Sequence, residues 1–308
     1  MIAVVGQSVI DRVTLPGCPP LVRLGGSPIF AGQAMEAAGA GAVLVTRGAT
    51  PALRRPLHAL GLRVVEGPST RSCISEMVLH PDGSCTDGFG AFGDPFTPAD
   101  VLGWMAPGLA GARVVACGAQ WRDDLPAETL AALAAGGRLV YLDGQGPLRA
   151  PRLGPLALER GLTPALLRHV ALLKLAEEEA AVALGGIHAA AARVLGVPTV
   201  VVTRGHRGAV ALVDGEAIEI GVEPVLGLAD TVGAGDAFLA LMAVEQTRGT
   251  PVIEAAWRAC ASVASLLRRR LAATVALPGP AAGAVAAPAG GGGAGGLESA
   301  ARFRPAPE

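Results

Sequence analysis

The chain has 308 residues, of which 51% are hydrophobic and only 3% aromatic, and its formal net charge at pH 7 is −1. This length and composition predict one large α/β domain or two smaller ones, with a core of small and branched aliphatic side chains. The near-zero net charge argues against a nucleic acid or a membrane surface as the partner.

Cysteines and histidines are few and scattered along the sequence. The five cysteines are odd in number and form no CxxC pair, so we expect reduced thiols in a cytoplasmic protein. The five histidines show no metal-ligand spacing, which argues against a zinc site. We expect no membrane span because no run of about 18 apolar residues occurs. The first residues also lack the basic region of a signal peptide.

The first elements combine buried strands with a glycine turn. Ile2 to Val5 is an aliphatic run typical of a buried parallel strand, and Asp11 follows shortly after it. Gly25 and Gly26 then open a predicted helix of small residues, and the next strand is Ala42 to Thr46. Ligands of α/β sheets bind at such strand ends, which makes Asp11 a candidate binding residue, with a surface turn acid as the alternative.

A hairpin is predicted further along. Residues 72–79 alternate between apolar and polar side chains, and the turn signal Pro81-Asp82-Gly83 follows them. Cys73 and Cys85 lie at unequal distances from this turn, so we expect no disulfide between them.

Strands and helices alternate from residue 97 onward. Thr97 and Pro98 begin a helix, with Thr97 as the N-cap. The expected strands are residues 114–117, 139–142, 170–175 and 199–203, with helices between them. This rhythm predicts an α/β fold with a doubly wound, mostly parallel sheet and helices on both faces. Asp214-Gly215 joins two further strands, 209–213 and 216–220, in a type I′ hairpin.

Residues 230–241, DTVGAGDAFLAL, place two glycines and an acid directly before an apolar helix. The helix N-terminus would aim free backbone N–H groups at an anion. Gly233 and Gly235 would let a phosphate approach the backbone closely. Asp236 would then be a carboxylate suited to take a proton from an attacking hydroxyl. The alternative is a plain glycine turn followed by an ordinary helix acid.

A last helix is predicted from Val252 to Leu271. The triplet Arg268 to Arg270 would end this helix, where positive charge suits the helix dipole. Residues 279–308 are rich in Ala, Gly and Pro and too poor in large apolar residues for a core, so we expect a disordered tail.

The stretch Asp230 to Asp236 resembles the C-terminal signature of the ribokinase-like carbohydrate kinases, the PfkB family, and Gly25-Gly26 resembles the N-terminal signature. The resemblance covers roughly residues 1–278, which we expect to form one ribokinase-like kinase domain. It implies a small β lid over the sugar, for which residues 9–24 and 72–90 are the candidates.

The resemblance also implies the reaction. We expect an ATP-dependent kinase that phosphorylates a hydroxyl of a small sugar or polyol, with Mg²⁺ and an optional monovalent cation as cofactors. Such a protein would be a monomer or a homodimer formed through the lid.

The family's functional roles carry over residue by residue. Catalysis falls on Asp236 as the base and on Gly233, Ala234 and Gly235 as the anion hole. Substrate binding falls on Asp11, Gly25, Gly26, Phe30, Gln145 and Arg149, the last two through a DxQGxxR stretch seen in one branch of the family. ATP binding falls on Lys174, Thr203, Gly205, Gly208, Thr231 and Cys260, and Mg²⁺ binding on Glu179.

Two positions depart from the family pattern. Phe30 stands where the family has an Asn that binds a sugar hydroxyl, so we expect an acceptor with an apolar face toward the ring, unless Phe30 belongs to the core. Ala176 replaces the Asn of an Asn-x-x-Glu pattern. Three acids in the first turn of a helix could also simply complement its dipole, which is the alternative for Glu179.

The sequence bears on three other functions. A nucleoside or vitamin-precursor kinase of the same fold stays open, because the acceptor contacts lie in the variable lid. The departures at Phe30 and Ala176 also leave open a catalytically silent nucleotide-binding regulatory protein. A Rossmann dehydrogenase is disfavoured, since no GxGxxG follows the first strand.

Overall fold

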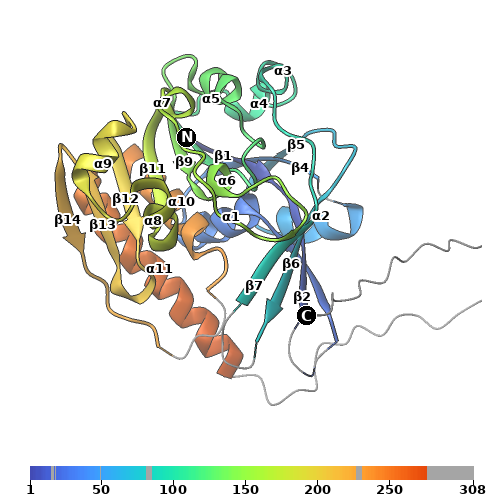
Figure 1. The fold of residues 1–308 in the computed structure, drawn as a ribbon. Coiled ribbons are helices and arrows are strands. Elements are labelled where there is room, and N and C mark those ends of the chain that lie inside the picture. The colour runs from blue at the N-terminus through green and yellow to red at the C-terminus, as the bar shows by residue number, and fades with distance from the viewer. Residues whose placement is uncertain (15–16, 18, 49, 81–84, 227–230, 276–308) are drawn as a thin grey trace, which may run out of the picture.

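The structure is a computed structural model that describes residues 1–14, 17, 19–48, 50–80, 85–226 and 231–275 (Figure 1). The predicted tail at 279–308, the turn at 81–83 and Asp230 lie outside the described residues.

Nine strands of the described chain form the main sheet, seen in Figure 1. From one edge to the other they are β14 (Glu216–Ile220), β13 (Ala209–Val213), β12 (Thr199–Thr203), β11 (Val170–Ala176), β9 (Leu139–Asp143), β8 (Val114–Gly118), β1 (Ile2–Gln7), β4 (Ala42–Arg47) and β5 (Arg63–Glu66). Neighbouring strands from β12 to β5 are parallel, and β13 is antiparallel to both of its neighbours, β12 and β14. Asp214 and Gly215 both have positive φ, as a type I′ turn requires.

Helices cover both faces of this sheet, so the predicted doubly wound α/β fold is confirmed. One face carries α1 (Ser27–Ala37), α2 (Pro51–His58), α10 (Ala234–Thr247) and α11 (Val252–Val275). The other carries α3 (Pro98–Leu102), α4 (Ala106–Leu109), α5 (Ala127–Ala134), α6 (Gln145–Leu148), α7 (Pro164–Leu167), α8 (Glu177–Leu184) and α9 (Ala189–Val194). Both α10 and α11 pack against each other and contribute buried alanines to the core on this face.

The last helix continues beyond its predicted end. We expected α11 to end at Leu271 with the arginine triplet in its last turn, but the helix reaches Val275. The arginines instead contact the segment before α10. Arg268 lies 2.7 Å from a carboxylate oxygen of Glu223, and Arg270 donates to the carbonyl of Val232 at 2.9 Å.

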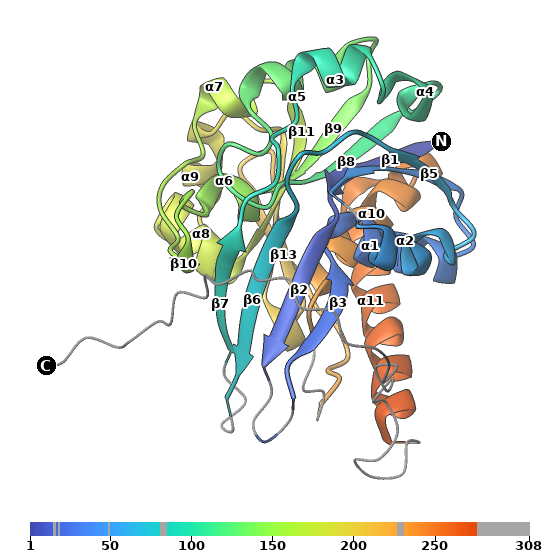
Figure 2. The same ribbon diagram turned by 90° about the vertical axis from the view of Figure 1, so that its right-hand side faces the viewer.

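A second, smaller sheet projects from the main domain, as Figure 2 shows. Its strands lie in the order β10 (Gly154–Pro155), β7 (Cys85–Ala91), β6 (Cys73–Leu79), β2 (Val9–Thr14) and β3 (Leu21–Gly25). Four of them come from the two segments predicted for a lid, and β10 was not predicted. We call this sheet the lid sheet; that it covers an acceptor stays a prediction.

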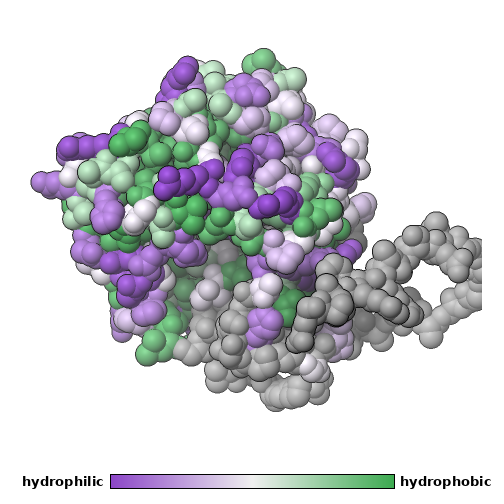
Figure 3. Space-filling model, in the orientation of Figure 1, coloured by the Kyte–Doolittle hydropathy of each residue, from purple (hydrophilic) through white to green (hydrophobic). Residues whose placement is uncertain are grey.

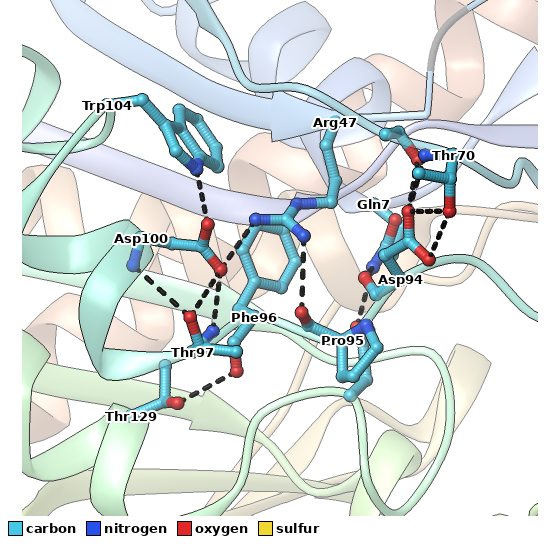
Figure 4. A network of polar contacts seen from close by, with 12 residues as sticks. Gln7, Arg47, Thr70, Asp94, Pro95, Phe96, Thr97, Asp100, Trp104 and Thr129 are labelled. Atoms are coloured by element: carbon cyan, nitrogen blue, oxygen red, sulfur yellow. Dashed lines mark hydrogen bonds and ion pairs between the residues drawn. The ribbon is translucent and has the colours of Figure 1, made fainter.

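The lid sheet is tied to the core where three of its connections meet (Figure 4). Gln7 is the last residue of β1 and donates from Nε2 to the Asp94 carbonyl at 2.7 Å and to Oδ1 of the buried Asp124 at 2.8 Å. The Asp94 carboxylate accepts from the backbone and the hydroxyl of Thr70, in the segment that leads to β6. These bonds hold the chain segments before β2, before β6 and after β7 against one another.

Arg47 at the end of β4 supports the same joint (Figure 4). Its guanidinium lies 4.9 Å from the ring centre of Phe96 and 5.2 Å from that of Trp104, and it pairs with Asp100 at 2.7 Å. Such a buried, paired and stacked arginine fixes the segment after β7 in one position.

The face of the molecule shown in Figure 3 intersperses hydrophilic and hydrophobic residues. In the described part of the chain, no helix is long and apolar enough to cross a membrane.

Candidate active site

The carboxyl ends of the central strands bring several predicted site residues together. The strand register aligns Gly118 of β8, Asp143 of β9 and Lys174 of β11 side by side. Each of these strands runs one residue further than the sequence predicted. Gly118 and Asp143 are the last residues of β8 and β9, and Lys174 lies two residues before the end of β11. This edge is where open α/β sheets bind ligands.

The glycine turn begins α10 at the same edge. Gly233 is the N-cap with φ +78°, a conformation that favours glycine, and Ala234 is the first helical residue. The first i→i−4 bond of this helix runs from the Ala237 N–H to the Gly233 carbonyl. The amides of Gly235 and Asp236 come before this bond and are therefore available to an anion.

The ammonium group of Lys174 lies directly against this turn. A side-chain carbon added at Gly235 would be only 2.6 Å from the Nζ atom, so glycine permits the close approach. Nζ contacts both carboxylate oxygens of Asp143, at 3.2 and 3.1 Å, and both side chains are buried. Burial alone would lower the pKa of Lys174, but the charges of Asp143, Glu179 and Asp236 raise it, so the ammonium stays charged.

Asp236 lies in the first turn of α10, partly exposed but surrounded by protein on most sides. Burial raises its pKa to about 6, and the neighbouring charge of Asp143 acts in the same direction. A hydrogen bond from Ser27 and the charges of Lys174 and Arg149 oppose this shift in pKa. A carboxylate with a pKa just below neutrality is well matched to the work of a general base.

A cavity of about 470 Å³ lies on one side of the turn. Its lining includes five of the six residues predicted to bind ATP: Thr203, Gly205, Gly208, Thr231 and Cys260. Ala234 and Gly235 also line it, so the cavity reaches the anion turn. Lys174, the sixth predicted residue, is not in this lining and lies against Gly235 instead. Much of the remaining lining is apolar, with Phe238, Val263 and Leu267 among it. This size is within the range of small-molecule and cofactor pockets.

Glu179 is buried at the third position of α8. Its Oε2 accepts a hydrogen bond from the Ala176 N–H at 2.7 Å, so the carboxylate caps its own helix. Burial raises the pKa of Glu179, which the positive charge of Lys174 opposes. Within the described residues, no group of three or more His, Cys, Asp or Glu side chains is arranged to hold a metal ion.

The predicted acceptor residues lie on the lid side of the edge. Asp11 is buried on β2, and a side-chain carbon at Gly25 would be 2.1 Å from its Oδ2. Gly26 is the N-cap of α1, and Gln145 begins α6. Arg149 at the end of α6 reaches the lid sheet, where its Nη2 lies 3.4 Å from Oδ2 of Asp87.

Phe30 lies one helical turn after Gly26, and its N–H donates to the Gly26 carbonyl at 3.4 Å. Its ring lies against the backbone of Gly233, and it lines a separate cavity of about 280 Å³ between α1, α10 and α11. It also packs against the core formed with these helices.

Sequence reasoning missed Ser27 and Asp87. It placed Asp143 at a strand's carboxyl end, as the first residue of the DxQGxxR stretch, but did not assign it a site role. Ser27 and Asp87 gave no signal, because their contacts with Asp236 and Arg149 join distant parts of the chain.

The fold and the site together define a ribokinase-like α/β protein with a small second sheet. Residues 146–278 match the model of the pfkB family carbohydrate kinases, so the resemblance inferred from the sequence is confirmed. A pyrophosphate-dependent kinase in the ribokinase family, solved with a pyrophosphate analogue and myo-inositol, is similar in structure. Its TM-score is 0.74 and its sequence identity is 19%, over 87% of this chain and 95% of that one.

Two further solved structures show the same fold. Phosphofructokinase-2 from Escherichia coli, in complex with fructose-6-phosphate, has a TM-score of 0.63 and 17% identity, over 87% of this chain and 94% of that chain. Adenosine kinase from Sinorhizobium meliloti has a TM-score of 0.64 and 15% identity, over 87% of this chain and 98% of that chain.

Proposed function

We propose that this protein is a kinase that transfers a phosphoryl group from ATP to a hydroxyl of a small sugar or polyol. The position of Asp236 and of the Gly235 amide at the start of α10 carries this proposal. The 470 Å³ cavity reaches the turn from one side, and Arg149 connects its other side to the lid sheet. A carboxylate and a helix N-terminus between this cavity and the lid sheet suit the transfer of a phosphoryl group.

In the proposed reaction, Asp236 accepts the proton of the acceptor hydroxyl while the oxygen of that hydroxyl attacks the γ-phosphorus of ATP. The bond from that phosphorus to the β–γ bridging oxygen breaks, and ADP leaves with this oxygen. The amides of Gly235 and Asp236 and the ammonium of Lys174 stabilise the charge on the transferred group. These groups are already fixed in place by the helix and by the Lys174–Asp143 pair.

Mg²⁺ is the expected metal. Mg²⁺ sites in phosphoryl-transfer enzymes commonly use one or two carboxylates together with substrate phosphates and water. Here Glu179 and Asp143 offer carboxylate oxygens beside Lys174. When bound, Mg²⁺ would neutralise charge on the donor phosphates. The monovalent cation, the cytoplasmic location and the choice between monomer and lid-mediated homodimer remain predictions.

Pyrophosphate is the second candidate donor, because a pyrophosphate-dependent kinase has a similar fold. The cavity favours ATP. Its apolar side chains, such as Phe238 and Val263, could contact a purine ring, whereas pyrophosphate would leave them uncovered. Nucleosides remain alternative acceptors, since an adenosine kinase shares the fold. A silent nucleotide-binding protein remains the alternative of a different class.

The test is a matrix of donors and acceptors. ATP and pyrophosphate, each with and without Mg²⁺, are combined with sugars, inositols, linear polyols and nucleosides, and phosphorylated acceptors are detected by mass spectrometry. We expect turnover with ATP, and turnover at least about 100-fold slower in the Asp236→Asn variant. Turnover with pyrophosphate alone would overturn the proposed donor, and ATP binding without any transfer would favour the silent protein.

A variant of the cavity separates the two donors further. Ala264 is buried on α11 and lines the cavity, so Ala264→Phe should raise the KM for ATP at least about tenfold by filling the space of the base. Pyrophosphate would be unaffected by this change. Ser262→Phe, at an exposed position two residues earlier on the same helix, is the matched control.

A further inference from the structure

The inner face of the lid sheet carries a set of paired charges. Strand register places Asp11 of β2 opposite Arg23 of β3 and Ser75 of β6. It likewise places Met77 of β6 opposite Asp87 of β7, on the same face as Ser75. Asp11 is buried while its neighbour Arg12 is exposed, which identifies this face as the inner one.

Arg149 approaches this face from the core. Its guanidinium lies 6.0 Å from the ring centre of Phe89 and 3.4 Å from Oδ2 of Asp87, and its side chain is only 16% exposed. The charge of Arg149 also acts on Asp236, which places it within electrostatic reach of the proposed base. Arg149 therefore spans the space between the lid sheet and the reacting group.

Asp87 is held in place to receive this guanidinium. Its Oδ1 accepts from the Ser75 hydroxyl at 3.1 Å and from the Gly88 N–H at 2.8 Å, which leaves Oδ2 directed at Arg149. Arg23, the other guanidinium on the inner face, lies 3.6 Å from Oδ2 of Asp11. Among the described residues, each of these two guanidinium groups thus lies beside a lid carboxylate.

This pairing has a consequence for the acceptor. At Arg149 and Arg23 an anionic acceptor would meet guanidinium groups whose charge is already balanced by a neighbouring carboxylate, and it would also meet the negative charge of Asp236. An uncharged polyol meets neither obstacle, since its hydroxyls can bond to carboxylates and guanidinium groups that are already paired.

We propose that the acceptor is an uncharged polyol, and that Asp87 excludes phosphorylated and carboxylated sugars by neutralising Arg149. This inference rests on the proposed kinase function. Asp87 is the specificity-determining residue, and Arg149 is the group that it controls. Replacing Asp87 with Asn keeps an oxygen for Ser75 and Gly88 but frees the guanidinium for an anion.

The experiment compares neutral acceptors with carboxylates of the same size: glucose with glucuronate, sorbitol with gluconate, and ribitol with ribonate. The kcat/KM values are measured for the wild type, Asp87→Asn and the control Glu76→Gln. Glu76 is an exposed carboxylate on the outer face of the same sheet, paired with Arg12. We expect the wild type to favour the neutral member of each pair at least about tenfold, the scale of one charge-assisted hydrogen bond.

In Asp87→Asn this preference should fall by about tenfold, and in Glu76→Gln it should stay unchanged. A wild type that uses the carboxylates as well as the neutral acceptors would overturn the inference while leaving the kinase proposal intact. Equal preferences in Asp87→Asn and Glu76→Gln would overturn the role of Asp87.

A binding measurement keeps the test independent of turnover. Calorimetry with gluconate and no donor should show at least about tenfold tighter binding to Asp87→Asn than to the wild type, and this gain should vanish in Asp87→Asn/Arg149→Gln. If no donor or acceptor is turned over, the kinase proposal fails, yet this comparison still decides whether Asp87 masks Arg149. Absence of any gain would overturn that masking.

Discussion

The ring of Phe30 lies against the backbone of Gly233, at the start of the proposed anion site. A side-chain carbon at Gly233 would be 2.1 Å from Cγ of this ring. The contact joins α1 to the turn before α10, two elements that are far apart in the sequence. It indicates that Phe30 supports the turn, in addition to or in place of the acceptor contact expected from its position in the family pattern.

Replacing Phe30 with Asn separates these two roles. If the ring supports the turn, Phe30→Asn should lower the free energy of unfolding by roughly 1–3 kcal/mol, because packing is lost beside Gly233. It should also lower kcat/KM for all acceptors alike. The measurement is kcat/KM for ribose, fructose, inositols and nucleosides, together with chemical denaturation. Suppose instead that ribose and fructose are poor substrates of the wild type, and that Phe30→Asn raises kcat/KM only for polyhydroxylated acceptors such as these sugars. That result would show that the ring faces the acceptor.

Asp236→Asn should lower kcat at least about 100-fold, the usual scale for losing a general base. The fold and the affinity for ATP should change little, because Asn has the same shape. Circular dichroism and ATP calorimetry control for these. Wild-type turnover in this variant would rule out Asp236 as the base.

The pH dependence gives an independent check on Asp236. The base must be deprotonated, so kcat/KM should rise with pH and level off above about 6, the value to which burial raises the pKa of Asp236. The Ser27 hydrogen bond lowers this pKa, so Ser27→Ala should move the midpoint to higher pH. A midpoint that does not move, or that moves to lower pH, would contradict the assignment.

Much of this site could be predicted from local sequence. The turn at Gly233 to Asp236, the strand ending at Thr203 and the cap at Thr97 each depend on residues close together in the chain, whose backbone preferences are visible in the sequence. The position of Cys260 in the cavity followed from the family pattern, not from any local preference.

The pairs between distant residues could not be predicted. Asp143 and Lys174 meet because β9 and β11 are neighbours in the sheet, and strand order is not written in either segment. The same is true of Asp87 and Arg149. The end of α11 was misjudged because the arginine triplet looked like a helix end, whereas Arg270 contacts the carbonyl of Val232 instead.

The Lys174–Asp143 pair should be needed for both stability and transfer. Lys174→Met leaves the Asp143 carboxylate buried without its partner, so we expect a loss of roughly 3–5 kcal/mol in the free energy of unfolding. The double variant Lys174→Met/Asp143→Asn should regain most of this stability but not the activity, since the positive charge beside Gly235 stays absent. Denaturation and kcat are measured on both. A double variant with wild-type kcat would limit the lysine to a structural role.

The two roles of Glu179 can be separated by Glu179→Gln. The amide oxygen of Gln can still accept from the Ala176 N–H, so the helix cap is kept while the charge is lost. If Glu179 contributes to the metal site, the Mg²⁺ concentration for half-maximal rate should rise several-fold, and Ala176→Asn should lower it. Glu178→Gln, at the exposed neighbouring position, is the control. No change with either variant would leave Glu179 as a cap and helix acid only.

Asp124 should make the stability of the fold depend on pH. It is fully buried beneath the contacts that tie the lid sheet to the core. Its Oδ1 accepts from Gln7 and its Oδ2 from the Gln120 N–H, and burial raises its pKa to about 7. An unfolded Asp has a pKa of about 4, so between about pH 4 and 7 the folded state binds more protons than the unfolded state. The free energy of unfolding contributed by this group should therefore be highest at low pH and fall as pH rises through this window.

Asp124→Asn should flatten that slope in urea denaturation between pH 5 and 8, whereas Asp123→Asn, at the exposed neighbouring position, should keep it. Equal slopes in the two variants would show that Asp124 does not titrate in this range.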